Sequence, residues 1–202
     1  MNKEDRIKKI HEMFVNFSDS IKNIPIDDSF SETIDKIIKC NGKIITTGIG
    51  KAGIAMKKFS ALLSSLGFPS CFLHPTEAQH GDLGILQKHD ILFICSVSGK
   101  TREIFEIISL ARALNVSYII GLTSHPDSPI RDKVDLVIDM GVIKEEGHLK
   151  LSPTTSILVI LSITDSLALI SAEEKGLTKE QYSKFHHAGY IGANARGDGK
   201  IL

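Results

Sequence analysis

The sequence has few cysteines and no excess of charge of either sign. Its three cysteines, Cys40, Cys71 and Cys95, are an odd number without C-x-x-C spacing, which argues against a disulfide framework and a zinc ribbon. Lysine plus arginine number 24, and aspartate plus glutamate also number 24, so the formal net charge is zero. This balance excludes a chain-wide basic surface for nucleic acid but leaves room for a local cationic pocket.

Segments that direct a protein to a membrane or out of the cell are also missing. Residues 1–6 carry mixed charges and lead into no apolar region, so we expect no signal peptide. The most apolar stretch, residues 156–170, contains Asp165 and is shorter than a bilayer span. At 202 residues and 42% hydrophobic composition, without internal repeats, the chain is predicted to be a cytoplasmic globular protein with no membrane partner.

Alternating strand and helix patterns occupy the middle of the chain. Short, continuous apolar runs favour parallel strands, because both faces of a parallel sheet are covered. The expected strands cover residues 43–47, 70–73, 90–95, 117–122 and 134–139, and the expected helices between them cover residues 51–66 and 101–114. This order predicts an α/β doubly wound domain whose five-stranded parallel sheet is flanked by helices.

Further helical patterns lie on both sides of this region. Residues 3–22 carry apolar side chains three to four positions apart, and residues 27–40 begin with N-cap residues. Two more helices are expected at about residues 152–172 and 178–185. The first of these is apolar nearly all round, so we expect subunit contacts to cover part of it.

The first strand is followed by a glycine-rich turn, residues 48–53, which fits G-x-G-x-x-G. A dinucleotide site of that type needs an acidic residue at the end of the second strand, and the sequence there is Leu73-His74-Pro75. A tight turn into a helix is one alternative. The interpretation that we favour is a sugar or phosphate site to which Lys51 supplies positive charge.

The third strand is followed by a turn rich in hydroxyl groups. Ser96, Ser98 and Thr101 surround Gly99 just before a helix begins. Backbone N–H groups, hydroxyls and the positive end of a helix together bind phosphate. Helix capping alone would need only one hydroxyl, so the excess favours a phosphate site. Glu103 in the same turn is a weak indication of a catalytic carboxylate.

Longer motifs link the sequence to a known family. They are residues 48–53, the run H-P-T-E-A-Q-H-G-D-L-G at residues 74–84, residues 96–99 with Glu103, residues 144–145, and residues 153–156. With these motifs the chain resembles the sugar isomerase (SIS) domain and, within it, the arabinose-5-phosphate isomerases of the Kdo pathway. The resemblance predicts an N-terminal helix at 1–27, a SIS domain at 28–192 and a flexible tail at 193–202.

The resemblance implies a flavodoxin-like fold in a homotetramer, with active sites between subunits, N- and C-terminal helices in oligomer contacts, and no required cofactor or metal. The implied reaction interconverts D-arabinose 5-phosphate and D-ribulose 5-phosphate. Matched to the family's motifs, the catalytic residues are Lys51, Glu103, Glu145 and His186. The implied substrate-binding residues are Gly50, His80, Ser96, Ser98, Thr101, Thr154 and Ser156.

Such an isomerisation moves a proton between C1 and C2 through an enediolate. Glu145 or Glu103 is the expected base, His186 the ring-opening or shuttling group, and Lys51 the stabiliser of negative oxygen. Taken alone, Glu145 lies in a charge run, Lys144-Glu145-Glu146, that is typical of a solvated surface. The family resemblance is what assigns it to the site.

Three departures from the family pattern keep other functions open. Lys100 stands where an acidic residue is usual, and the terminal His-Pro-Gly-Gly is replaced by residues 186–189, so His187 competes with His186 for the catalytic position. The paired cystathionine-β-synthase-type domain of many relatives does not follow in this sequence. The alternatives are an isomerase of a hexulose or heptulose phosphate and a non-catalytic, sugar-phosphate-binding regulator.

Overall fold

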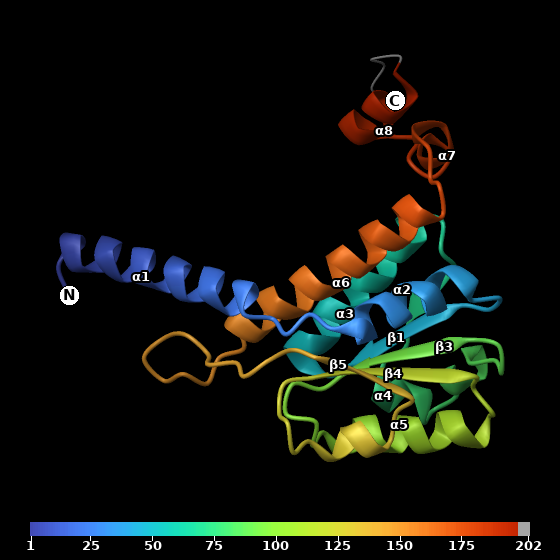
Figure 1. The fold of residues 1–202 in the computed structure, drawn as a ribbon, viewed down its shortest axis with the longest axis horizontal. Coiled ribbons are helices and arrows are strands. Elements are labelled where there is room, and N and C mark those ends of the chain that lie inside the picture. The colour runs from blue at the N-terminus through green and yellow to red at the C-terminus, as the bar shows by residue number, and fades with distance from the viewer. Residues whose placement is uncertain (198–202) are drawn as a thin grey trace.

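The computed structural model describes residues 1–197 and has a parallel sheet at its centre (Figure 1). The strands are β1 (Ile44–Gly48), β2 (Ser70–Phe72), β3 (Ile91–Cys95), β4 (Tyr118–Thr123) and β5 (Leu136–Asp139). Their order is β2-β1-β3-β4-β5, and every neighbouring pair is parallel. The predicted five-stranded, doubly wound sheet is thus confirmed. Its topological switch point lies between β1 and β3, where such sheets bind ligands at the carboxyl ends of the strands.

Helices cover both faces of the sheet (Figure 1). On one face lie α2 (Asp28–Lys39), α3 (Gly50–Ser65) and α6 (Thr155–Glu174), and on the other lie α4 (Pro75–Ala78) and α5 (Arg102–Ala113). Two short 3₁₀ helices, η1 (Asp82–Ile85) and η2 (Pro129–Asp132), complete the connections. The sequence predicted neither α4 nor η1, because both are single turns without a repeating apolar pattern.

Each face has its own apolar core, which fixes the helices against the strands. Phe59 of α3 and Phe93 of β3 meet edge to face with ring centroids 5.1 Å apart, and both are fully buried. On the other face, Ile104 and Ile107 of α5 pack with Ile94 of β3. The continuous apolar sequence of β3 therefore serves both cores, as expected for an interior parallel strand.

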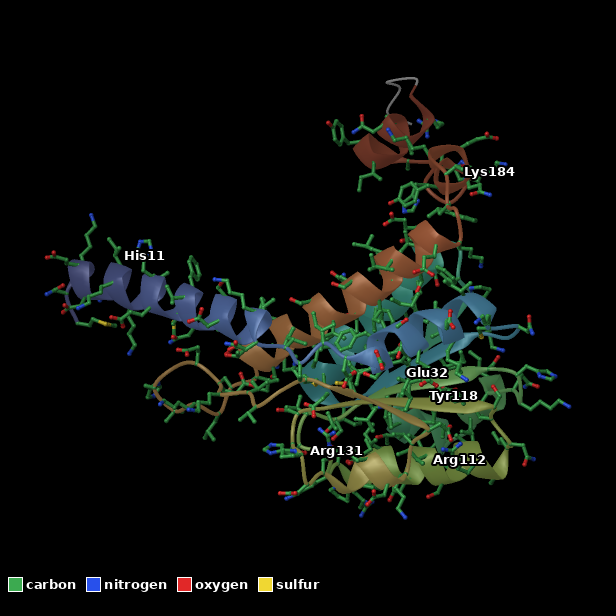
Figure 2. All side chains as sticks on the ribbon, viewed as in Figure 1. His11, Glu32, Arg112, Tyr118, Arg131 and Lys184 are labelled. Carbon is green, nitrogen blue, oxygen red and sulfur yellow. The ribbon has the colours of Figure 1, made fainter. Side chains whose placement is uncertain are left out.

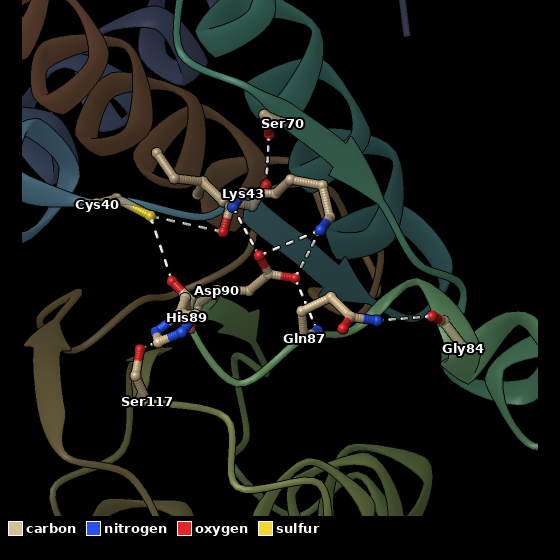
Figure 3. A network of polar contacts seen from close by, with 9 residues as sticks. Cys40, Lys43, Ser70, Gly84, Gln87, His89, Asp90 and Ser117 are labelled. Atoms are coloured by element: carbon tan, nitrogen blue, oxygen red, sulfur yellow. Dashed lines mark hydrogen bonds and ion pairs between the residues drawn. The ribbon is translucent and has the colours of Figure 1, made fainter.

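An ion pair with a buried carboxylate joins the amino ends of β1 and β3 (Figure 3). The Asp90 carboxylate is 1% exposed and lies 3.0 Å from Lys43 Nζ. It also accepts hydrogen bonds from the backbone N–H of Lys43 at 2.7 Å and of Gln87 at 2.9 Å. The polar groups at the amino end of the sheet are therefore paired with one another and hold β1 and β3 together. Ligand binding is expected at the opposite, carboxyl end.

Helix α6 is the one described helix that is long and apolar enough to cross a membrane. From the sequence we expected an apolar stretch of residues 156–170, shorter than a bilayer span. The helix is longer than that stretch, since it extends over 20 residues. More than half of its apolar window is buried inside the protein. It packs against α2 and α3, and Val159, Ile160 and Leu167 belong to the core, so α6 is the central helix of a soluble fold.

The terminal helices extend beyond the sheet. Helix α1 (Lys3–Lys22) projects to one side and buries none of its residues, with Phe14 62% exposed. Helices α7 (Lys179–Ser183) and α8 (Gly189–Arg196) continue past the end of α6 (Figure 1). Residues 193–196, expected to belong to a flexible tail, form the end of α8, and residues 198–202 lie outside the described part. Oligomer contacts through these helices stay a prediction.

Candidate active site at the carboxyl edge of the sheet

A cavity of about 380 Å³ lies at the carboxyl edge of β1 and β3, within the size range of small-molecule sites. Segments that are far apart in the sequence meet there. Its lining consists of Ile49, Gly50, Lys51, Ala52, Cys95, Ser96, Val97, Ser98, Thr101, His125, Glu145, Pro153, Ser156 and Ile157. Seven of the eleven residues assigned to the site from sequence are in this set, which makes the cavity the candidate active site.

The turn after β3, residues 96–101, is called the serine turn from here on. Ser96 Oγ and Thr101 Oγ1 are 2.9 Å apart, and the N–H of Gly99 donates to the carbonyl of Ser96 at 3.0 Å. Gly99 has φ of +61°, a left-handed conformation that other residues rarely adopt. The turn therefore holds its hydroxyl groups in a fixed arrangement beside the start of α5.

The serine turn packs on the end of β4 and on the residues that follow this strand. The N–H of Ser124 donates to the carbonyl of Val97 at 3.0 Å. Thr123 Oγ1 lies 3.1 Å from Ser128 Oγ, and both residues are buried directly under Gly99. A side chain at position 99 would collide with Ser128, so the close approach as well as the backbone angle requires glycine here.

Three helices, α3, α5 and α6, begin at the cavity, and the first N–H groups of α3 and α5 are free to bind an anion. Neither Ile49, before α3, nor Thr101, before α5, caps its helix with a side chain. Orphan N–H groups and the helix dipole at such ends attract anions. Lys51 adds a side-chain charge, because it is exposed on the first turn of α3 and forms no ion pair with a described residue. These features suit a phosphate group.

The side chain of Glu145 lies at the start of the third helix, α6. Its Oε2 accepts hydrogen bonds from the N–H groups of Thr154 at 2.7 Å and Thr155 at 2.9 Å. The Thr154 hydroxyl lies 3.3 Å from the same oxygen. The solvated surface that the charge run suggested is therefore wrong for this residue: Glu145 is half-buried, held by the helix end, and turned to the cavity. Thr154, assigned to the substrate, instead contacts Glu145.

Two buried hydroxyl groups near the start of α6 lack a partner within the described chain. Ser156 Oγ and Thr155 Oγ1 are each in residues about 1% exposed, and neither makes a hydrogen bond. Buried polar groups are almost always paired, so an orphan beside a cavity marks where a ligand can donate or accept. Ser156 lines the cavity and fits this description.

Three predicted residues lie away from the cavity. Glu103 is half-buried on the first turn of α5 but does not line it. His80 is exposed between α4 and η1. His186 follows α7, where its ring stacks on Tyr182 with centroids 3.9 Å apart and its Nδ1 lies 3.2 Å from the Tyr182 carbonyl. The single chain thus brings Lys51 and Glu145 together but not these three.

Two lining residues with titratable side chains, His125 and Cys95, were not assigned to the site from the sequence. His125 lies two positions after the end of β4, and its place just beyond a strand of a parallel sheet was the signal that could have found it. Cys95 ends β3, and complete burial raises the pKa of its thiol to about 12. The Cys95 thiol therefore stays protonated and lines the cavity without acting as a nucleophile.

Other arrangements in the described chain suit the chemistry less well. A hollow of about 490 Å³ lies between α1 and residues 140–150, lined by side chains of both charges such as Asp19 and Lys144. It has no free helix start and no hydroxyl turn. Within residues 1–197, no cluster of three His, Cys, Asp or Glu side chains could hold a metal ion.

Comparison with known proteins agrees with this geometry. The family model of the SIS domain matches residues 36–170, which is more than half of the chain. The chain belongs to the SIS domain family. The arabinose 5-phosphate isomerase KdsD of Pseudomonas aeruginosa is 36% identical to this SIS chain over 167 residues, or 83% of this chain and 51% of that protein. The arabinose 5-phosphate isomerase GutQ of Escherichia coli K12 is 34% identical over 168 residues, or 83% of this chain and 52% of that protein.

Solved structures extend the similarity to three dimensions. The protein c3406 of Escherichia coli CFT073, crystallised in complex with arabinose 5-phosphate, has a TM-score of 0.87 and 32% identity. The match covers 92% of this SIS chain and all of the solved one. The chain spans about half the length of the curated relatives it matches. The family resemblance drawn from the motifs is thus confirmed.

Proposed function

We propose that this SIS chain is an aldose–ketose isomerase of sugar phosphates, with D-arabinose 5-phosphate and D-ribulose 5-phosphate as its substrate pair. The observation that carries the proposal is that the serine turn, Lys51 and Glu145 share one cavity. An anion site, a cation and a carboxylate are the parts that an enediolate reaction needs around a phosphorylated sugar. The arabinose 5-phosphate bound to the similar c3406 protein supports the five-carbon substrate.

The phosphate binds at the serine turn. The hydroxyls of Ser96, Ser98 and Thr101 and the free N–H groups at the start of α5 surround it. Held there, the sugar chain extends toward Glu145 and Ser156, which line the same cavity. Anchoring the phosphate away from the reacting carbons lets its binding energy orient C1 and C2.

Glu145 is the base in this mechanism. Its carboxylate takes the proton from C2 of the aldose, the C2 electrons form the C1–C2 double bond, and the negative charge gathers on O1. The ammonium group of Lys51 stabilises that oxygen. The O2 proton then passes to O1, and Glu145 returns its proton to C1, which yields the ketose with no net change in protons. No cofactor enters these steps.

The shuttling and ring-opening groups come from a second copy of the chain. His186 and His80 lie outside the cavity of their own chain, as does Glu103. The helices α7 and α8 extend away from the sheet with Tyr190 71% exposed and Ile191 58% exposed. Such apolar surface favours contact with another subunit. In a cytoplasmic homotetramer, this contact would carry His186 into a neighbouring cavity.

The decisive experiment is a substrate panel followed by NMR in D₂O. Arabinose 5-phosphate, a hexulose 6-phosphate and a heptulose 7-phosphate are incubated with the enzyme, and deuterium entering at C1 or C2 is measured. We expect exchange and turnover with arabinose 5-phosphate. Turnover restricted to a six- or seven-carbon substrate would replace this substrate with another. Tight binding of a sugar phosphate without any exchange would favour a non-catalytic regulator.

A pair of neighbouring variants isolates the base. Glu145→Gln keeps the size of the side chain but removes the base, so the rate of exchange should fall by about 10²-fold or more. Glu146→Gln is the matched control, because Glu146 contacts Asn16 on α1 and does not line the candidate site. Equal rates in the two variants would contradict the role of Glu145.

A further inference from the structure

We propose that His125 is a phosphate-binding residue of this site, which donates to the phosphate from the side opposite Lys51. The inference rests on the proposed function in one respect, that the ligand's phosphate lies at the serine turn. Its consequence is specific to this chain: the affinity for the phosphate group depends on a histidine that neither the motifs nor the family resemblance assigned.

Sheet order places the two side chains on either side of the turn. Lys51 follows β1, the serine turn follows β3, and His125 follows β4, while β3 lies between β1 and β4 in the sheet. Because parallel strands end at the same edge, the turn is flanked by Lys51 on one side and His125 on the other. Both residues line the cavity.

The backbone of His125 is held in place, although its ring is not. The His125 carbonyl accepts hydrogen bonds from the N–H of Ser128 at 3.1 Å and from Arg131 Nε at 2.9 Å. Arg131, labelled in Figure 2, in turn forms an ion pair with Asp139 at 2.6 Å, so its guanidinium is engaged at the end of β5. Arg131 therefore positions the loop and leaves phosphate contact to the histidine.

The segment that carries His125 is the same one that supports the serine turn. Ser124, its neighbour, donates to Val97, and Ser128 lies beneath Gly99. Movement of the turn and of His125 is thereby coupled. The imidazole is exposed and forms no hydrogen bond with a described residue, so its N–H is free to donate to an anion.

The charged side chains that line the cavity also favour a further hydrogen-bond donor to the phosphate. Lys51 is the single lysine or arginine that lines it among the described residues, and Glu145 is its single carboxylate. The Glu145 charge opposes the two charges of a phosphate monoester. A donor on the far side of the turn from Lys51 offsets that repulsion at the phosphate without weakening the base.

The test measures the binding of inorganic phosphate and of arabinose 5-phosphate by titration calorimetry at constant ionic strength. His125→Ala should weaken the binding of both ligands and raise both dissociation constants by the same factor, roughly three- to tenfold. His125→Arg should restore most of the loss. His89→Asn is the matched control, because His89 is an exposed histidine at the opposite, amino end of the sheet. Melting curves of each variant establish that the fold is kept.

Kinetics separate phosphate binding from a role in proton transfer. If His125 binds phosphate, His125→Ala raises KM by the binding factor and leaves kcat within about twofold. An unchanged dissociation constant for phosphate, or a fall in kcat alone, would overturn the proposal. Because inorganic phosphate binds without being turned over, this failure is distinct from failure of the isomerase function, which would appear as absent C1/C2 exchange in the parent protein.

Discussion

Gly99 offers a quantitative test of how the serine turn is built. In Gly99→Ala the new Cβ would lie 2.6 Å from Ser128 Cβ and 2.9 Å from Thr123 Oγ1, and closer still to Ser128 Oγ. Nonbonded atoms do not approach so closely, and both neighbours are buried under the turn. Either Ser128 must move and lose its hydrogen bond to Thr123, or the turn must lift away from β4.

The cost of this substitution has three parts. A left-handed backbone at an alanine costs about 1–2 kcal/mol. Overpacking a buried site costs about 1–3 kcal/mol, and a broken Thr123–Ser128 hydrogen bond about 1 kcal/mol. Alanine also lowers the conformational entropy of the unfolded chain, which stabilises the folded state by about 0.4–1 kcal/mol. The free energy of unfolding should therefore fall by about 2–6 kcal/mol, and phosphate affinity should fall with it.

Urea unfolding at fixed protein concentration measures the effect. The matched control is Gly176→Ala, since Gly176 also has a positive φ, +75°, but a Cβ there meets no atom within 4 Å. It should cost about 1 kcal/mol, the backbone part alone. Placing Gly99→Ala in a Ser128→Ala background should recover part of the difference. Equal losses at positions 99 and 176 would refute the packing of the turn described above.

Three further predictions concern the site and the surface. Lys51→Met should abolish turnover while Lys57→Met, on the exposed face of the same helix, should not; assays of initial rate decide. With a pKa of about 12, Cys95 should resist a thiol reagent at pH 8 until urea unfolds the chain, and rapid labelling of the native protein would contradict its burial. Phe14→Glu on α1 should reduce the mass measured by light scattering, and an unchanged mass would show that α1 makes no subunit contact.

The sheet could be predicted because its sequence signals are local. Five short, continuous apolar runs, with helical patterns at residues 51–66 and 101–114, favour parallel strands, and the glycine-rich turn and the serine turn mark two of their carboxyl ends. The short helices α4 and η1 were missed, since a single turn shows no periodicity. Helix α8 was missed because its glycines at 189 and 192 disfavour helix, although the segment folds against α7.

From the residues alone, the site was predictable only where one strand end supplies several residues, whereas Glu145 and Ser156 were assigned by the family resemblance. Nothing in the sequence joins Glu145 to the start of α6, because that contact depends on how residues 146–153 fold back. His125 stands alone in its loop, without a motif around it. His186 was assigned by resemblance, and its own chain holds it against Tyr182, outside the cavity.

A crystal of the protein soaked with arabinose 5-phosphate would show directly where the phosphate binds and which carbons face Glu145. We expect phosphate oxygens within hydrogen-bond distance of Ser96, Ser98 and Thr101, with C2 of the sugar facing the Glu145 carboxylate. A sugar phosphate bound with its phosphate elsewhere, or with C1 and C2 turned away from Glu145, would contradict this expectation.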